Sequence, residues 1–290
     1  MLPFGMLATF AVGTVLQFAS LATADGVTFP ATVELDLIFP RNGTTYAPGP
    51  KFPIVFAIQN APAAASLDFE IDIVLHNSSR GLTHLEPVGT FEASNNSAAF
   101  ASGASKTFYF HYVTDKLQGE VPTDWTVGWT VLTTNCSGSG ADAGAANISI
   151  ASFSTKPGAQ AADLVASAAA DAASNSSCQA SIDSSITFGI TGVQNITVQD
   201  HKHGKKHNDT RAPTTCAALS NVQPPSNPCA ARLDPATASS IATAVNSSSS
   251  SNSSTAAQPK KNGGASIFGR QSSIWESAAL LAVVGWIVCL

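Results

Sequence analysis

Hydrophobic and polar residues alternate with a period of two along several stretches between Thr32 and Thr155. Apolar side chains at every second position, separated by polar or charged ones, predict strands that bury one face. The apolar positions, stretch by stretch, are Val33, Leu35, Leu37 and Phe39; Phe52, Ile54, Phe56 and Ile58; Leu67, Phe69, Ile71, Ile73 and Leu75; Phe108, Phe110 and Tyr112; Trp125, Val127, Trp129 and Val131; Ile148 and Ile150. Short strands with turn residues and no helix between them predict an all-β fold, an immunoglobulin-like antiparallel β-sandwich over residues 25–156.

The composition changes after Pro157. Residues 160–173 are rich in alanine and predict a helix, while the apolar positions of residues 186–198 predict one β-hairpin. We interpret residues 157–234, which contain most of the cysteines, as a disulfide-stapled C-terminal appendage docked on the sandwich. Residues 235–262 are mostly Ser, Thr, Ala and Asn, so we expect them to form a disordered stalk without a core of its own.

Both ends of the chain resemble processing signals. Residues 6–19 are almost wholly apolar and are followed by Ala22-Thr23-Ala24, a small-x-small site of the kind that signal peptidase cuts. This pattern predicts a signal peptide over residues 1–24 and a mature chain that begins at Asp25. The protein is therefore expected to enter the secretory pathway.

The C-terminal end has the pattern of a glycosylphosphatidylinositol (GPI) anchor signal. Asn262-Gly263-Gly264 supplies small residues at the cleavage point, residues 265–277 form a polar spacer, and residues 278–290 form an apolar tail. At roughly 1.5 Å per residue the tail reaches roughly 20 Å, less than the roughly 30 Å of a bilayer core. We expect a lipid at Asn262, loss of residues 263–290, and attachment to the outer leaflet of the plasma membrane or to the cell wall.

Asparagine is used mainly in glycosylation sequons. Ten of the fifteen Asn residues begin an Asn-x-Ser/Thr triplet, whereas chance would give roughly three. Charged residues are 11% of the chain and the net charge is −5, so we expect sugars to keep the chain soluble, and nothing suggests a nucleic-acid partner. The predicted N-glycosylation sites are Asn42, Asn77, Asn95, Asn135, Asn147, Asn175, Asn195, Asn208, Asn246 and Asn252.

Cysteine usage fits an oxidising compartment. Removal of Cys289 with the C-terminal tail leaves four of the five cysteines, Cys136, Cys178, Cys216 and Cys229. Four cysteines predict two disulfides, and all three pairings remain open. No CxxC occurs, so the spacing does not suggest a zinc site.

Acidic residues on two predicted strands are the sharpest catalytic candidates. Glu34-Leu35-Asp36 and Glu70-Ile71-Asp72 resemble the start of the Glu-x-Asp-x-(x)-Glu strand of fungal GPI-anchored transglycosylases. The second Glu of that motif is absent in both places, where Ile38 or Phe39, and Val74 or Leu75, stand instead. We therefore interpret Asp68, Glu70 and Asp72 as the solvated face of a strand and assign no catalytic residue. A wall-remodelling glycoside hydrolase or transglycosylase is the less favoured alternative.

Histidines offer a weak metal candidate. His201, His203 and His207 lie within seven residues and could bind copper or zinc. Three lysines interleave with them and a sequon begins at Asn208, so we interpret the segment as a hydrophilic loop and expect neither a metal nor a cofactor. The other histidines, His76, His84 and His111, have no recognisable partner motif, and no Gly-x-Ser-x-Gly occurs.

Aromatic residues bear on the choice between core and ligand site. Trp125 and Trp129 share a strand face with Val127 and Val131, which favours packing in the core. The alternative is an exposed aromatic pair that stacks on sugar rings, which would make the chain a cell-wall glycan-binding module.

Several segments together resemble a family of secreted fungal proteins defined only as a domain of unknown function. The resemblance covers residues 29–245 and rests on residues 33–41, 46–48, 53–60, 125–129 and 135–137 and on the Cys216–Cys229 region. It implies a filamentous-fungal surface glycoprotein, often GPI-anchored, and provides no catalytic residue to carry over. We expect a non-enzymatic, GPI-anchored surface or cell-wall glycoprotein with a structural or recognition role.

Overall fold

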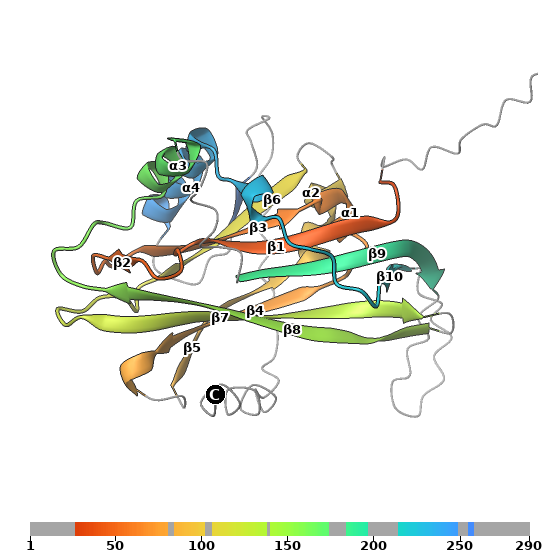
Figure 1. The fold of residues 1–290 in the computed structure, drawn as a ribbon, viewed down its shortest axis with the longest axis horizontal. Helices are drawn as coiled ribbons and strands as arrows, with labels where there is room; N and C mark the ends of the chain where they lie inside the picture. The colour runs from red at the N-terminus through yellow and green to blue at the C-terminus, as the bar shows by residue number, and fades with distance from the viewer. Residues whose placement is uncertain are drawn as a thin grey trace, which may run out of the picture.

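The strands of the protein form two facing sheets (Figure 1). The structure is a computed structural model that describes residues 27–80, 84–101, 106–137, 140–173, 184–196, 214–248 and 255–257. The signal peptide, Cys178, the three clustered histidines (His201, His203 and His207) and the predicted anchor at Asn262 lie outside these residues. Within the described part of the chain, no helix has the length and apolar character needed to cross a membrane.

The first sheet has six strands that pair antiparallel in the order β10-β9-β1-β3-β6-β11. Their bounds are β1 (Ala31–Phe39), β3 (Phe52–Gln59), β6 (Thr107–Thr114), β9 (Ser185–Ile196), β10 (Thr214–Leu219) and β11 (Thr255–Ala257). The second sheet has the order β2-β8-β7-β4-β5 and is antiparallel except for the short β2–β8 pair. Its strands are β2 (Thr45–Tyr46), β4 (Glu70–Asn77), β5 (Leu85–Glu92), β7 (Thr123–Ser137) and β8 (Gly140–Thr155).

Aromatic rings from both sheets fill the space between them. The indole of Trp129 on β7 meets the ring of Phe56 on β3 edge-on at 5.4 Å between centroids. Phe52 on β3 stacks on Phe153 of β8, also at 5.4 Å. The rings of β3 and β7 come from the alternate apolar positions of those strands, which confirms a mostly antiparallel β fold with two layers. On β8 the predicted face is wrong, because Ile148 and Ile150 are 41% and 45% exposed and Ala151 and Phe153 face the core instead.

The helices are short and lie outside this core. They are α1 (Ala61–Ala64), α2 (Ser97–Ala101), α3 (Leu164–Ala173) and α4 (Pro235–Ser247), with 3₁₀ turns η1 (Ser78–Arg80), η2 (Ala93–Asn96) and η4 (Pro228–Ala231). Helices α3 and α4 lie side by side over the outer face of the six-stranded sheet (Figure 1). The alanine-rich segment is thus confirmed as a helix, beginning at Leu164.

The predicted hairpin and appendage are wrong. Residues 185–196 form one strand, β9, which pairs with β1 on one side and β10 on the other. The six-stranded sheet therefore includes strands from both sides of the expected boundary at residue 157. Alternation alone could not show this, because it gives the faces of a strand and not its neighbours.

The predicted stalk is wrong where the structure describes it. Residues 235–247 form α4, which buries Ala238, Ile241 and Val245 at helical spacing. Asp234 caps this helix, since its carboxylate accepts from the backbone N–H groups of Ala236 and Thr237 at 2.9 Å. Strand β11 then pairs with β6. A segment poor in large apolar residues still packs here, because these three apolar side chains lie on one face of the helix.

A disulfide connects the two sheets. Cys136 on β7 is bonded to Cys216 on β10, with 5.8 Å between their Cα atoms. Cys229 is also disulfide-bonded. The predicted use of these cysteines is confirmed, and the Cys136–Cys216 pairing, which the sequence left open, is given by the structure.

Candidate functional site

A segment between β10 and α4 crosses the outer face of the six-stranded sheet (Figure 1). We call this segment, residues 220–234, the strap. Strand alternation determines what lies under it, because side chains at every second position of each strand point away from the core. The register places Thr187, Glu34 and Gln59 in one row across β9, β1 and β3.

Four adjacent strands each supply one side chain that hydrogen-bonds to the strap. The contacts are thus distributed across the sheet, and each satisfies a backbone group of a segment without regular structure. Thr187 Oγ1 donates to the carbonyl of Pro224 at 2.7 Å, Asn227 N–H donates to both carboxyl oxygens of Glu34 at 2.8 Å, Gln59 Nε2 donates to the carbonyl of Asn227 at 2.9 Å, and the Tyr109 hydroxyl donates to the carbonyl of Arg232 at 3.0 Å.

Two carboxyl groups lie beneath the strap. Glu34 is 4% exposed and Asp36 has no exposed surface. Asp36 accepts from Gln59 Nε2 at 2.8 Å and from Ser185 Oγ at 2.7 Å, and the two carboxyls lie in hydrogen-bonding contact with each other. Nothing in the alternating pattern distinguished this buried pair from Glu70 and Asp72 on β4, of which Glu70 is exposed and Asp72 half-buried.

Burial makes both of these carboxyls weaker acids than usual. Loss of solvation, followed by the nearby Asp36, raises the pKa of Glu34 to about 7. Burial likewise raises the pKa of Asp36, although hydrogen bonds from Gln59 and Ser185 oppose the rise. Both carboxyls therefore keep a proton to higher pH than exposed carboxyls do.

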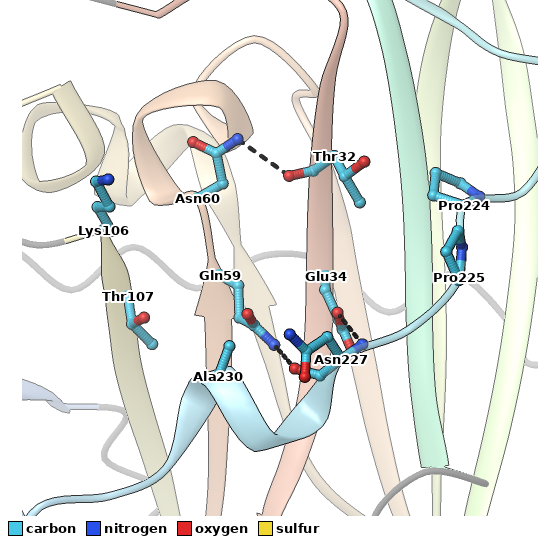
Figure 2. Close-up of a pocket in the computed structure, with 10 residues that line it drawn as sticks. All are labelled: Thr32, Glu34, Gln59, Asn60, Lys106, Thr107, Pro224, Pro225, Asn227 and Ala230. Atoms are coloured by element: carbon cyan, nitrogen blue, oxygen red, sulfur yellow. Dashed lines mark hydrogen bonds between the residues drawn. The ribbon is translucent and has the colours of Figure 1, made fainter.

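The strap and the sheet enclose a pocket of about 560 Å³ (Figure 2). Glu34 and Gln59 lie on its sheet side, Pro224 and Pro225 form one wall, and Lys106 stands on the opposite side (Figure 2). Its lining residues are Thr32, Glu34, Gln59, Asn60, Lys106, Thr107, Pro224, Pro225, Asn227 and Ala230. This volume is within the range of small-molecule sites.

One edge of the pocket is formed by Asn60, which follows the last residue of β3 and occupies the N-cap position of α1 without a capping side-chain hydrogen bond. Its backbone is left-handed, with φ 55° and ψ 48°, a conformation that asparagine tolerates better than most residues. Its Nδ2 donates to the carbonyl of Thr32 at 3.0 Å, which ties the turn to β1. The amide of Asn60 is thereby fixed beside the pocket.

The arrangement suits binding better than two-carboxylate catalysis. A glycosidase of the retaining type needs two carboxyl groups that both reach the substrate. Only Glu34 lines the pocket, since Asp36 is fully buried. Among the described residues no group of three His, Cys, Asp or Glu side chains is arranged to hold a metal ion.

The tryptophans are in the core, as the sequence indicated. Trp129 is 1% exposed and Trp125 is 8% exposed, and Trp125 Nε1 donates to Thr155 Oγ1 at 2.9 Å. Neither ring is available as a platform for a sugar. Any glycan site of the described residues must therefore use other side chains.

The remaining sequence candidates are scattered. His76 and His84 lie on or beside β4 and β5, and His111 is buried on β6, so the three do not meet. Three of the sequon asparagines are exposed (Asn42, Asn95 and Asn246) and three are half-buried (Asn77, Asn135 and Asn147). Asn195 lies on β9, and Asn175, Asn208 and Asn252 fall outside the described residues.

A family model described as "Domain of unknown function (DUF7136)" matches residues 28–261. The match covers most of the chain, including both sheets, the strap and α4, so the chain belongs to this family. No curated protein matches the sequence. The family confirms the domain of unknown function that the resemblance indicated and assigns no activity to the pocket.

Proposed function

We propose that this DUF7136 protein is a fungal cell-surface glycoprotein that acts by recognition and not by catalysis. The terminal signal patterns support secretion and a GPI lipid at Asn262, and the ten sequons support a glycan coat. In this proposal the two-sheet fold is a variant of the immunoglobulin-like sandwich. Its partners are the outer leaflet of the plasma membrane, through the lipid, and a ligand of the cell envelope.

The pocket under the strap is the observation that favours recognition. It is lined by polar side chains whose positions are fixed by hydrogen bonds to the sheet and strap, which is the preorganisation that a binding site needs. Of the described residues, only one with a carboxyl group lines it. A binding role requires no second one.

Two measurements test this function. Phosphatidylinositol-specific phospholipase C should release the native protein from membranes, and mass spectrometry should find an ethanolamine-linked Asn262. Recovery of peptides that extend through Trp286 would contradict the anchor. For recognition, the protein released in this way should bind isolated cell walls, and Thr32→Val should weaken that binding while Thr130→Val on the other sheet leaves it unchanged.

A wall-remodelling hydrolase remains the second candidate because of one feature. The raised pKa of Glu34 is typical of a general acid, and Glu34 lines the pocket. This alternative predicts turnover of wall polymers that Glu34→Gln abolishes and Glu70→Gln, on the exposed face of β4, does not. Absence of turnover by the wild-type protein would remove the candidate.

A further inference from the structure

Three residues that line the pocket are fixed in place by hydrogen bonds from their side chains to neighbouring protein groups. Asn60 is held through Nδ2, which donates to Thr32, and Gln59 is held through Nε2, which donates to both Asp36 and Asn227. Both oxygens of Glu34 accept from the N–H of Asn227, and the carboxyl also lies in hydrogen-bonding contact with Asp36 and Ser185. A carboxyl has about four lone-pair positions, so part of the acceptor capacity of Glu34 remains for a ligand.

Several other polar atoms of the lining residues make no hydrogen bond within the described part of the chain and can therefore bind a ligand. Among the described residues, no hydrogen bond engages Oε1 of Gln59, Oδ1 of Asn60 or Oγ1 of Thr32, and none engages Nζ of Lys106. Figure 2 shows the Asn60 amide with its nitrogen turned to Thr32 and its oxygen turned the other way. The pocket thus offers several acceptors, one hydroxyl and one ammonium group at fixed positions.

The polar groups of the pocket disfavour anionic ligands and wholly apolar ligands. Glu34 lines the pocket with Asp36 buried beneath it, and Lys106 is the one cationic side chain among the lining residues, so an anionic ligand gains little. A wholly apolar ligand would bury these acceptors without partners, which is unfavourable. Hydroxyl groups can donate to these acceptors and also accept from Lys106.

The two prolines supply the remaining contact. Pro224 and Pro225 form a wall of apolar ring surface opposite the Lys106 side (Figure 2). A pyranose has apolar C–H faces and a rim of hydroxyls, and this combination matches an apolar wall beside a polar floor.

We propose that the pocket binds a neutral saccharide, with Thr32, Glu34 and Asn60 hydrogen-bonding to its hydroxyls and the two prolines packing on a face of the ring. The inference rests on the recognition role proposed above and specifies its ligand class. A sugar is favoured over a protein or a nucleic acid, because the polar groups lie within one pocket of sugar size.

The test uses the glycosylated protein released from its anchor and titrates it calorimetrically with neutral oligosaccharides of glucose, mannose and N-acetylglucosamine. Oligogalacturonate serves as the anionic comparison. We expect at least one neutral oligomer to bind, and Thr32→Val and Asn60→Gly each to weaken it about 3- to 10-fold, as expected for one hydrogen bond. Glycine is chosen at Asn60 because it keeps the left-handed backbone.

A matched control and the contrary outcomes complete the design. Thr130→Val, on the outer face of β7, should leave the affinity unchanged, and thermal unfolding of each variant should show that it is folded. If only oligogalacturonate binds, and does so through the pocket, the ligand class is wrong while recognition stands. If neutral sugars bind equally well to all variants, or if no sugar binds, the saccharide pocket is wrong. Loss of wall binding as well would then also overturn the proposed function.

Discussion

Replacement of Glu34 by Gln should change the pH dependence of stability more than stability itself. A carboxyl whose pKa is raised on folding binds its proton more tightly in the folded state. Its stabilising contribution is therefore complete below the ordinary pKa of 4.5 and is lost as the pH rises through about 7. Glutamine cannot ionise, so the variant lacks this loss.

The size of the effect follows from the two pKa values of Glu34. The interval from 4.5 to about 7, at about 1.4 kcal/mol for each pH unit, gives about 3 kcal/mol. One side of the carboxyl faces the open pocket, where water screens the charge, so we expect about 2 kcal/mol. The amide can preserve the contacts, since its oxygen accepts from Asn227 and its nitrogen can donate to Asp36.

The assay is urea unfolding of wild type and Glu34→Gln between pH 4 and pH 8. The two proteins should have similar free energies of unfolding at pH 4, and the variant should be more stable by about 2 kcal/mol at pH 8. Glu120→Gln removes the same charge from an exposed position and should follow the wild-type profile. Parallel profiles for wild type and Glu34→Gln would refute a protonated carboxyl beneath the strap.

Three further predictions concern other parts of the fold. A Cβ at Gly189 would lie 2.9 Å from the strap, so Gly189→Ala should lower the Tm and cost about 1–3 kcal/mol in denaturant unfolding, whereas Gly192→Ala, with open space around it, should not. Burial lowers the pKa of His111 below its ordinary 6.5, so the folded state loses stability as the pH falls through that value. His111→Leu should therefore reduce the difference between the free energies of unfolding at pH 5 and pH 8. The same difference in variant and wild type would contradict this prediction. Joint replacement of Cys136 and Cys216 by Ala should lower the free energy of unfolding by about 2–4 kcal/mol, because the disulfide joins residues 80 positions apart in the sequence. An unchanged urea midpoint would contradict this stabilising role of the disulfide.

The strands β1, β3, β4, β6 and β7 could be predicted because their signal is local, whereas β5, whose sequence LEPVGTFE does not alternate, could not. Ile54, Phe56 and Ile58 on β3 alternate, and each is fully buried between the sheets. The same signal could not identify the candidate site. Glu34 and Asp36 alternate with apolar residues as Glu70 and Asp72 do, and only a segment far along the chain decides which pair is covered.

The error over α4 had a different origin. Composition suggested that the Ser, Thr and Ala segment could not pack, but packing needs only a few contacts at the right spacing. Asp234 followed by Pro235 is a helix start of the kind found at many N-termini, with a capping carboxylate and a proline in the first turn. That local signal was present in the sequence and would have indicated the helix.

The position of β1 between β3 and β9 has a consequence for biosynthesis. During translation β3 soon follows β1, but the other edge of β1 stays unpaired until β9 has emerged, long after the first layer could have collapsed. A fragment that stops near residue 156 would therefore present the open edge of a hydrophobic strand to other chains, which is a recognised cause of aggregation. We expect the N-terminal half to aggregate when it is produced alone, so expression work should use the chain through β11.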